Sequence, residues 1–147
     1  MITPPITRFI GEAERTLQTL LLRQLQRAEL TFAEWVALTI LSGAGPVTVS
    51  KLTESIADAK VVASGSERDV VTGLVQRGLV GGEDKLNITE QGLEMFQPLR
   101  NKVREITASL ILDLPDDDLA TARRVLQTLT DRANQLLVSE PADRLQS

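Results

Sequence analysis

The side chains that most often carry out catalysis or bind transition metals are missing from this sequence. Its 147 residues include no cysteine and no histidine. Zinc sites built on thiolate or imidazole ligands, thiol redox switches and nucleophilic pairs that depend on Cys or His are therefore excluded. Most hydrolytic mechanisms are excluded with them. The sequence predicts a protein that is not an enzyme and that needs no cofactor or metal.

Three short segments contain residue types that could form a ligand or substrate site. Asp116, Asp117 and Asp118 offer carboxylates, but three consecutive residues of a helix point in three directions and suit the positive end of the helix dipole. The segment 43–45 (GAG) hints at a phosphate loop, but no Lys-Ser or Lys-Thr pair follows it. The segment 64–66 (SGS) lacks the Gly-x-Ser-x-Gly pattern of a nucleophile elbow. Each segment is better explained as a helix start, a helix end or a turn.

Length and charge limit the class of protein further. The chain is long enough for one domain, and 42% hydrophobic with 24% charged residues is typical of a folded protein. Its net charge is −4, whereas a protein that binds nucleic acid through its overall charge is positively charged. There is no long apolar run, and the first residues lack the pattern of a secretory signal, so we expect a cytoplasmic protein.

Apolar residues recur every three or four positions along most of the chain, which predicts a mainly helical fold. A first helix is expected over 6–27. The second should begin at a capping box of Thr31 and Glu34, with Leu30 and Trp35 as a hydrophobic staple. Gly43, Gly45 and Pro46 should end it. Its staple position makes Trp35 a core residue rather than part of a ligand pocket.

The middle of the chain predicts two short helices and a hairpin. Thr48 is expected to cap the third helix, and a second capping box, Ser64 with Glu67, is expected to start the fourth. Residues 79–88 contain a Gly-Gly-Glu-Asp turn between two apolar pairs and predict a short β-hairpin. Two long helices follow, the fifth capped by Thr89 and the last running from about Asp116 to residue 138.

Four segments in this order resemble the multiple-antibiotic-resistance-regulator (MarR) family of bacterial transcription factors. They are 30–38 (LTFAEWVAL), 74–80 (LVQRGLV), 88–92 (ITEQG) and 114–121 (LPDDDLAT). The resemblance covers roughly residues 6–138. It implies a mainly α, winged helix-turn-helix fold with a short β-hairpin wing, flanked by long N- and C-terminal dimerisation helices.

The resemblance also implies an organisation and a function. Residues 1–147 are expected to form a single MarR-like domain, with dimerisation helices at 6–29 and 93–138, the winged helix-turn-helix at 30–92 and a loose tail at 139–147. Such a protein is expected to be a homodimeric transcriptional regulator, a ligand-responsive repressor that binds a pseudo-palindromic double-stranded operator. Its ligand is expected to be a small molecule.

By position within the matched segments, the resemblance also implies the residues that contact DNA. The recognition helix is expected to start near Ser64 and to expose Ser66, Arg68, Asp69 and Thr72. The candidates for base edges are Ser64, Ser66, Arg68 and Thr72, and those for the DNA backbone are Thr48, Ser50, Lys51 and Lys85.

The charge of this region leaves a second interpretation open. The turn of the hairpin is Gly-Gly-Glu-Asp with Lys85 as its only cation, and Glu67 and Asp69 flank Arg68. Arg68 is therefore either a guanine-reading side chain or a surface arginine paired with a neighbouring carboxylate. The alternative function is an acidic winged-helix dimer that acts as a protein-interaction module without direct DNA binding.

Overall fold

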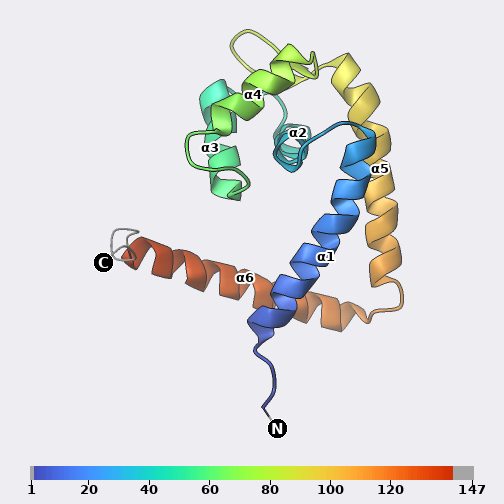
Figure 1. Cartoon of the computed structure of the whole chain (residues 1–147), viewed down its shortest axis with the longest axis vertical. Coiled ribbons are helices and arrows are strands. Elements are labelled where there is room, and N and C mark those ends of the chain that lie inside the picture. Colours follow the sequence, from blue (N-terminus) through green and yellow to red (C-terminus); the bar gives the residue numbers. More distant parts are fainter. Residues whose placement is uncertain (1, 141–147) are drawn as a thin grey trace. The chain divides into compact units, whose positions relative to one another are not determined.

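The chain folds into helices joined by turns and one small hairpin (Figure 1). The computed structural model describes residues 2–140. They belong to two compact units, the first ending at Ile106 and the second beginning at Thr107, inside the fifth helix. Within the described range, no helix is long and apolar enough to cross a membrane.

The first unit contains four complete helices, the hairpin and most of a fifth helix. Helix α1 runs from Ile6 to Arg27, as the apolar spacing predicts. Helix α1 packs against α2, and α2, α3 and α4 pack against one another. The bounds of the remaining helices of this unit are α2 Phe32–Ala44, α3 Val49–Ala59, α4 Glu67–Gln76 and α5 Glu90–Ile111.

The start of α2 is fixed by side-chain to backbone hydrogen bonds. The Glu34 amide donates to Thr31 Oγ1 at 3.1 Å, and the Thr31 amide donates to Glu34 Oε1 at 2.9 Å. This reciprocal pair confirms the predicted capping box and satisfies two backbone donors at the helix end. Leu30 is buried, and the Trp35 ring packs 5.1 Å from the ring of Phe96 on α5. Trp35 is half-buried and packs against the core, which agrees with its predicted structural role.

The predicted hairpin is present and has a third neighbour. Strands β1 (Val80–Gly81) and β2 (Asn87–Ile88) are antiparallel, with Val80 opposite Ile88. Leu86 also pairs with Val47, which lies in the turn before α3. The Val47 amide donates a hydrogen bond to the Leu86 carbonyl at 3.0 Å. This pairing joins the hairpin to the start of α3, and the local sequence pattern did not predict it.

Thr89 links the hairpin to α5. Its hydroxyl accepts a hydrogen bond from the Gly92 amide at 3.0 Å, which confirms the predicted cap. The same hydroxyl donates to the Gly78 carbonyl at 2.6 Å, at the end of the turn that follows α4. One side chain thus ties the end of α4 to the beginning of α5.

The apolar core of the first unit lies among α2, α3, α4 and the hairpin. Leu52 and Ile56 of α3 are completely buried, as are Leu74 of α4 and Phe96 of α5. Burial of one such side chain is worth roughly 1.5–3 kcal/mol, so this cluster dominates the stability of the unit. The buried side chains of α3 and α4 hold these two helices on the core.

The second unit contains helix α6, which runs from Asp116 to Ser139. The three consecutive aspartates occupy its first turn, where the helix dipole favours negative charge. Ser139, the first residue of the predicted tail, is the last helical residue, and 141–147 lie outside the described residues. Several large apolar side chains of this unit are exposed, namely Leu110, Ile111, Leu112, Leu114, Leu126, Leu136, Leu137 and Val138.

Candidate nucleic-acid interface

Three of the residues predicted to contact the DNA backbone lie at the start of α3. Thr48 caps the helix, because its hydroxyl accepts a hydrogen bond from the Lys51 amide at 3.1 Å. Thr48, Ser50 and Lys51 are all exposed. The N-terminus of a helix favours anions, so this turn suits a contact with a phosphate group.

Helix α4 begins later than the sequence predicted. It starts at Glu67 rather than near Ser64, and Ser64 lies in the preceding turn. The expected capping box is wrong because Gly65, with φ of 95°, turns the chain, and the Glu67 carboxylate accepts from the Gly65 amide at 2.9 Å. Ser66 is at the N-cap position without a capping side-chain hydrogen bond, and it is half-buried instead of exposed.

The remaining predicted residues of α4 lie on its solvent side. Arg68, Asp69 and Thr72 are exposed, whereas Val71 and Leu74 face the core. Within residues 2–140, the Arg68 side chain makes neither an ion pair nor a hydrogen bond. The interpretation of Arg68 as the partner of a neighbouring carboxylate is therefore not supported by the structure.

A shallow groove brings residues of α3 and α4 together. Arg68 lies in it with Ser50 and Thr53 of α3, so two predicted contact residues from different helices share one surface. Glu54 and Glu67 also line the groove, so it has two carboxylates and a single cation. The groove suits a polar partner that donates hydrogen bonds as well as accepting them.

The wing is short and tightly turned. Gly82 has φ of 135°, and a Cβ there would collide with the Lys85 carbonyl oxygen, so the turn requires glycine. Glu83, Asp84 and Lys85 are exposed at its tip. Lys85 is the only residue of the wing that can provide positive charge to a phosphate.

The charge of the whole surface is nearly balanced. Between Thr48 and Ile88 the sequence has five basic and six acidic residues. Lys51, Arg68 and Lys85 are exposed, and in the described part of the chain none of their side chains is paired. These three cations are available to a partner even though the region has no net positive charge.

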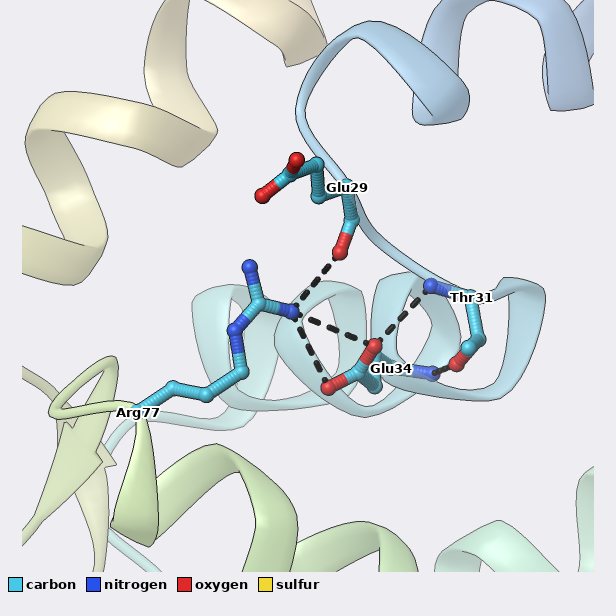
Figure 2. A network of polar contacts seen from close by, with 4 residues as sticks. All are labelled: Glu29, Thr31, Glu34 and Arg77. Atoms are coloured by element: carbon cyan, nitrogen blue, oxygen red, sulfur yellow. Dashed lines mark hydrogen bonds and ion pairs between the residues drawn. The ribbon is translucent and has the colours of Figure 1, made fainter.

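Arg77, which follows the last residue of α4, is the residue that sequence analysis missed. Its Nη1 donates to the Glu29 carbonyl at 2.9 Å and lies 3.3 Å from Glu34 Oε2 (Figure 2). Glu29 has a left-handed backbone with φ of 54°, at the corner between α1 and α2. Arg77 therefore binds the end of α4 to the capping box of α2. Its partners are more than 40 residues away in sequence, so no local pattern identifies them.

Solved structures of similar fold include MarR family transcriptional regulators. Ligand-free NadR matches with a TM-score of 0.72 at 19% sequence identity, covering 89% of this chain and 99% of NadR. CouR from Rhodococcus jostii RHA1, bound to p-coumaroyl-CoA, matches with a TM-score of 0.69 at 17% identity, covering 85% of this chain and 91% of CouR. The MarR family protein Rv2887 of Mycobacterium tuberculosis, in complex with DNA, matches with a TM-score of 0.66 at 20% identity, covering 86% of this chain and 98% of Rv2887.

These similarities establish the fold. The chain has the winged-helix fold of MarR family regulators, with α3 and α4 as the helix-turn-helix and β1 and β2 as the wing. No protein-family model and no curated protein sequence matches the chain.

The contact between Arg77 and Glu34 should be measurable as a coupling energy. Glu34 is only 13% exposed and Arg77 is 37% exposed, so solvent screens the pair incompletely. We expect Arg77→Met to lower the free energy of unfolding by about 1 kcal/mol. Glu34→Gln keeps a side chain that can complete the capping box, so a double-mutant cycle in urea should give a coupling of about 0.5–1 kcal/mol.

Arg23→Met is the matched control, because Arg23 is exposed and, within the described residues, has no ion pair. It should leave stability nearly unchanged. Strictly additive losses from Arg77→Met and Glu34→Gln would show that the two side chains do not act together.

Proposed function

We propose that this chain is a dimeric, DNA-binding transcriptional regulator of the MarR type that acts as a ligand-responsive repressor in the cytoplasm. The observation that carries the proposal is the position of α4. Val71 and Leu74 are buried in the core, Arg68 and Thr72 remain exposed, and Arg68 shares a groove with Ser50 in the first turn of α3. A helix held in this way can enter a major groove while the preceding helix contacts the DNA backbone. The DNA complex of Rv2887, a protein of similar fold, supports this assignment.

The proposed contacts follow from exposure and position. Arg68 and Thr72 face base edges, because they lie on the solvent side of the first turns of α4. Ser64 and Ser66, in the turn before α4, lie near the N-terminus of that helix, where a phosphate is favoured. The proposed contacts with the DNA backbone are Thr48, Ser50, Lys51 and Lys85.

The protein-interaction alternative rested on the acidic wing and the carboxylates near Arg68. Glu67 is hydrogen-bonded to the Gly65 amide, which accounts for one of those carboxylates without any partner protein. The DNA complex formed by a protein of similar fold does not favour the alternative.

Two ligand-bound structures of similar fold support regulation by a small molecule. They are NadR with 4-hydroxyphenylacetate and CouR with p-coumaroyl-CoA. We propose a small organic effector for this chain, and aromatic acids are a reasonable first set for a binding screen. Release of a bound duplex by one of them is the result that supports this part of the proposal.

DNA binding can be tested by fluorescence anisotropy with a duplex selected from a random-sequence pool and a scrambled version of it, at about 50 and 200 mM salt. Arg68→Ala should cost about 1–3 kcal/mol at one base position and relax specificity there. Lys51→Ala should weaken binding evenly across sequences and lower the salt slope by about one unit.

Lys102→Ala serves as the control, since Lys102 is an exposed cation of α5 outside the helix-turn-helix. It should leave the affinity for both duplexes unchanged. Equal, sequence-independent losses from Arg68→Ala and Lys51→Ala would contradict the role of Arg68, and no selective binding by the unmodified protein would contradict the proposed function.

Dimerisation is expected because large apolar side chains at the end of α6 are exposed. Leu136, Leu137 and Val138 are all more than half exposed, an arrangement that is costly unless a second surface covers it. Light scattering should give twice the chain mass of 16.1 kDa. Leu137→Glu should weaken the dimer, whereas Gln135→Glu, which adds the same charge two residues away, should not. A monomer of the unmodified protein at micromolar concentration would refute this assignment.

A further inference from the structure

One stripe of α4 faces directly away from the core. Asp69, Thr72, Gly73 and Gln76 follow the i, i+3, i+4, i+7 spacing of a single helix face. Val71 and Leu74, which are buried, lie on the opposite side of the helix. We refer to these four residues as the α4 stripe.

Gly73 in the middle of the α4 stripe has no structural explanation within the described chain. It lies inside a helix, its φ is not positive, and a Cβ added to it would meet no atom within 4 Å. Glycine in a helix interior is less favourable than alanine, so the fold alone would be better served by alanine. Gly73 is half-buried and lies on the same stripe as the exposed Thr72 and Gln76. A glycine that the fold does not need at this position indicates the close approach of another molecule.

Asp69, one turn before Gly73, limits what that molecule can present. Asp69 is exposed, and its side chain makes no hydrogen bond or ion pair within residues 2–140. A carboxylate only accepts hydrogen bonds and repels phosphate, so it does not suit the DNA backbone. In the major groove, cytosine presents an amino donor, whereas guanine and thymine present acceptors. Adenine presents a donor beside the N7 acceptor, which a carboxylate disfavours.

We propose that the α4 stripe is the base-reading face, that Gly73 marks where α4 lies closest to the floor of the major groove, and that Asp69 selects cytosine at one position of each half-site. This inference rests on the proposed function, since it specifies how the same interface reads its operator. It adds two determinants, Gly73 and Asp69, to Arg68 and Thr72.

The first test separates stability from binding. Gly73→Ala should raise the thermal unfolding midpoint and weaken binding to the duplex selected by the unmodified protein by about tenfold, the loss of one good base contact. Gly43→Ala is the matched control. Like Gly73, Gly43 is a helical glycine with open space for a Cβ, but it is exposed and lies near the end of α2. It should leave DNA binding unchanged.

The second test examines base preference. Selection from a random-sequence duplex pool should give sites with a preferred cytosine, and Asp69→Ala should lose the preference for cytosine at that position. Asp58→Ala removes the same charge from the end of α3, where Asp58 is also exposed. It should strengthen binding to scrambled DNA slightly while leaving the selected sequence unchanged.

The results of these two tests distinguish failure of this inference from failure of the proposed function. If the unmodified protein enriches a site, Gly73→Ala binds it as tightly as before and Asp69→Ala selects the same sequence, this inference is wrong and the proposed function stands. If the unmodified protein enriches no sequence, the proposed function fails and this inference fails with it. Weaker binding by Gly73→Ala together with a changed preference in Asp69→Ala supports it.

Discussion

The burial of Val71 and Leu74 determines which side of α4 faces solvent. Both side chains are almost completely buried among α2, α3 and the hairpin. Turning α4 by half a turn would expose them, at roughly 1.5–3 kcal/mol each, and would place the charge of Asp69 in the apolar core. The contact of Arg77 with Glu29 and Glu34 contributes less energy, but it fixes the end of the same helix (Figure 2). Core packing therefore sets the orientation of α4, and the Arg77 contacts set its position.

The nearly balanced charge of the interface changes how DNA recognition must work here. Lys51 and Lys85 are the only cations proposed to contact phosphate, and neither is paired within the described residues, so little of the binding energy comes from counterion release. Base contacts and shape then have to supply a larger share of the affinity. The proposed role of Asp69 agrees with this larger share of base contacts, because its carboxylate weakens binding to any DNA sequence that offers no hydrogen-bond donor at that position. Low bulk charge thus favours selectivity over non-specific affinity.

Local signals in the sequence predicted most of the fold, and one local turn and several long-range contacts account for what these signals missed. The capping box of Thr31 and Glu34 depends on neighbouring residues and was correct. The similar pattern at Ser64 and Glu67 was wrong because the left-handed Gly65 directs the Glu67 carboxylate to a different amide. The Val47 pairing and the Arg77 contacts join residues far apart in the chain, which no local pattern records. The role proposed for Gly73 depends on the space that an added Cβ would enter, which only the structure shows.

An NMR titration of the ¹⁵N-labelled protein with its selected duplex tests the central claim most directly. We expect the largest changes in amide signals in the first turn of α3, along α4 from Ser66 to Gln76 and at the tip of the wing near Lys85. Amides in the middle of α1 should change little. Changes centred on α1, or a titration in which the α4 signals stay unperturbed, would contradict the account.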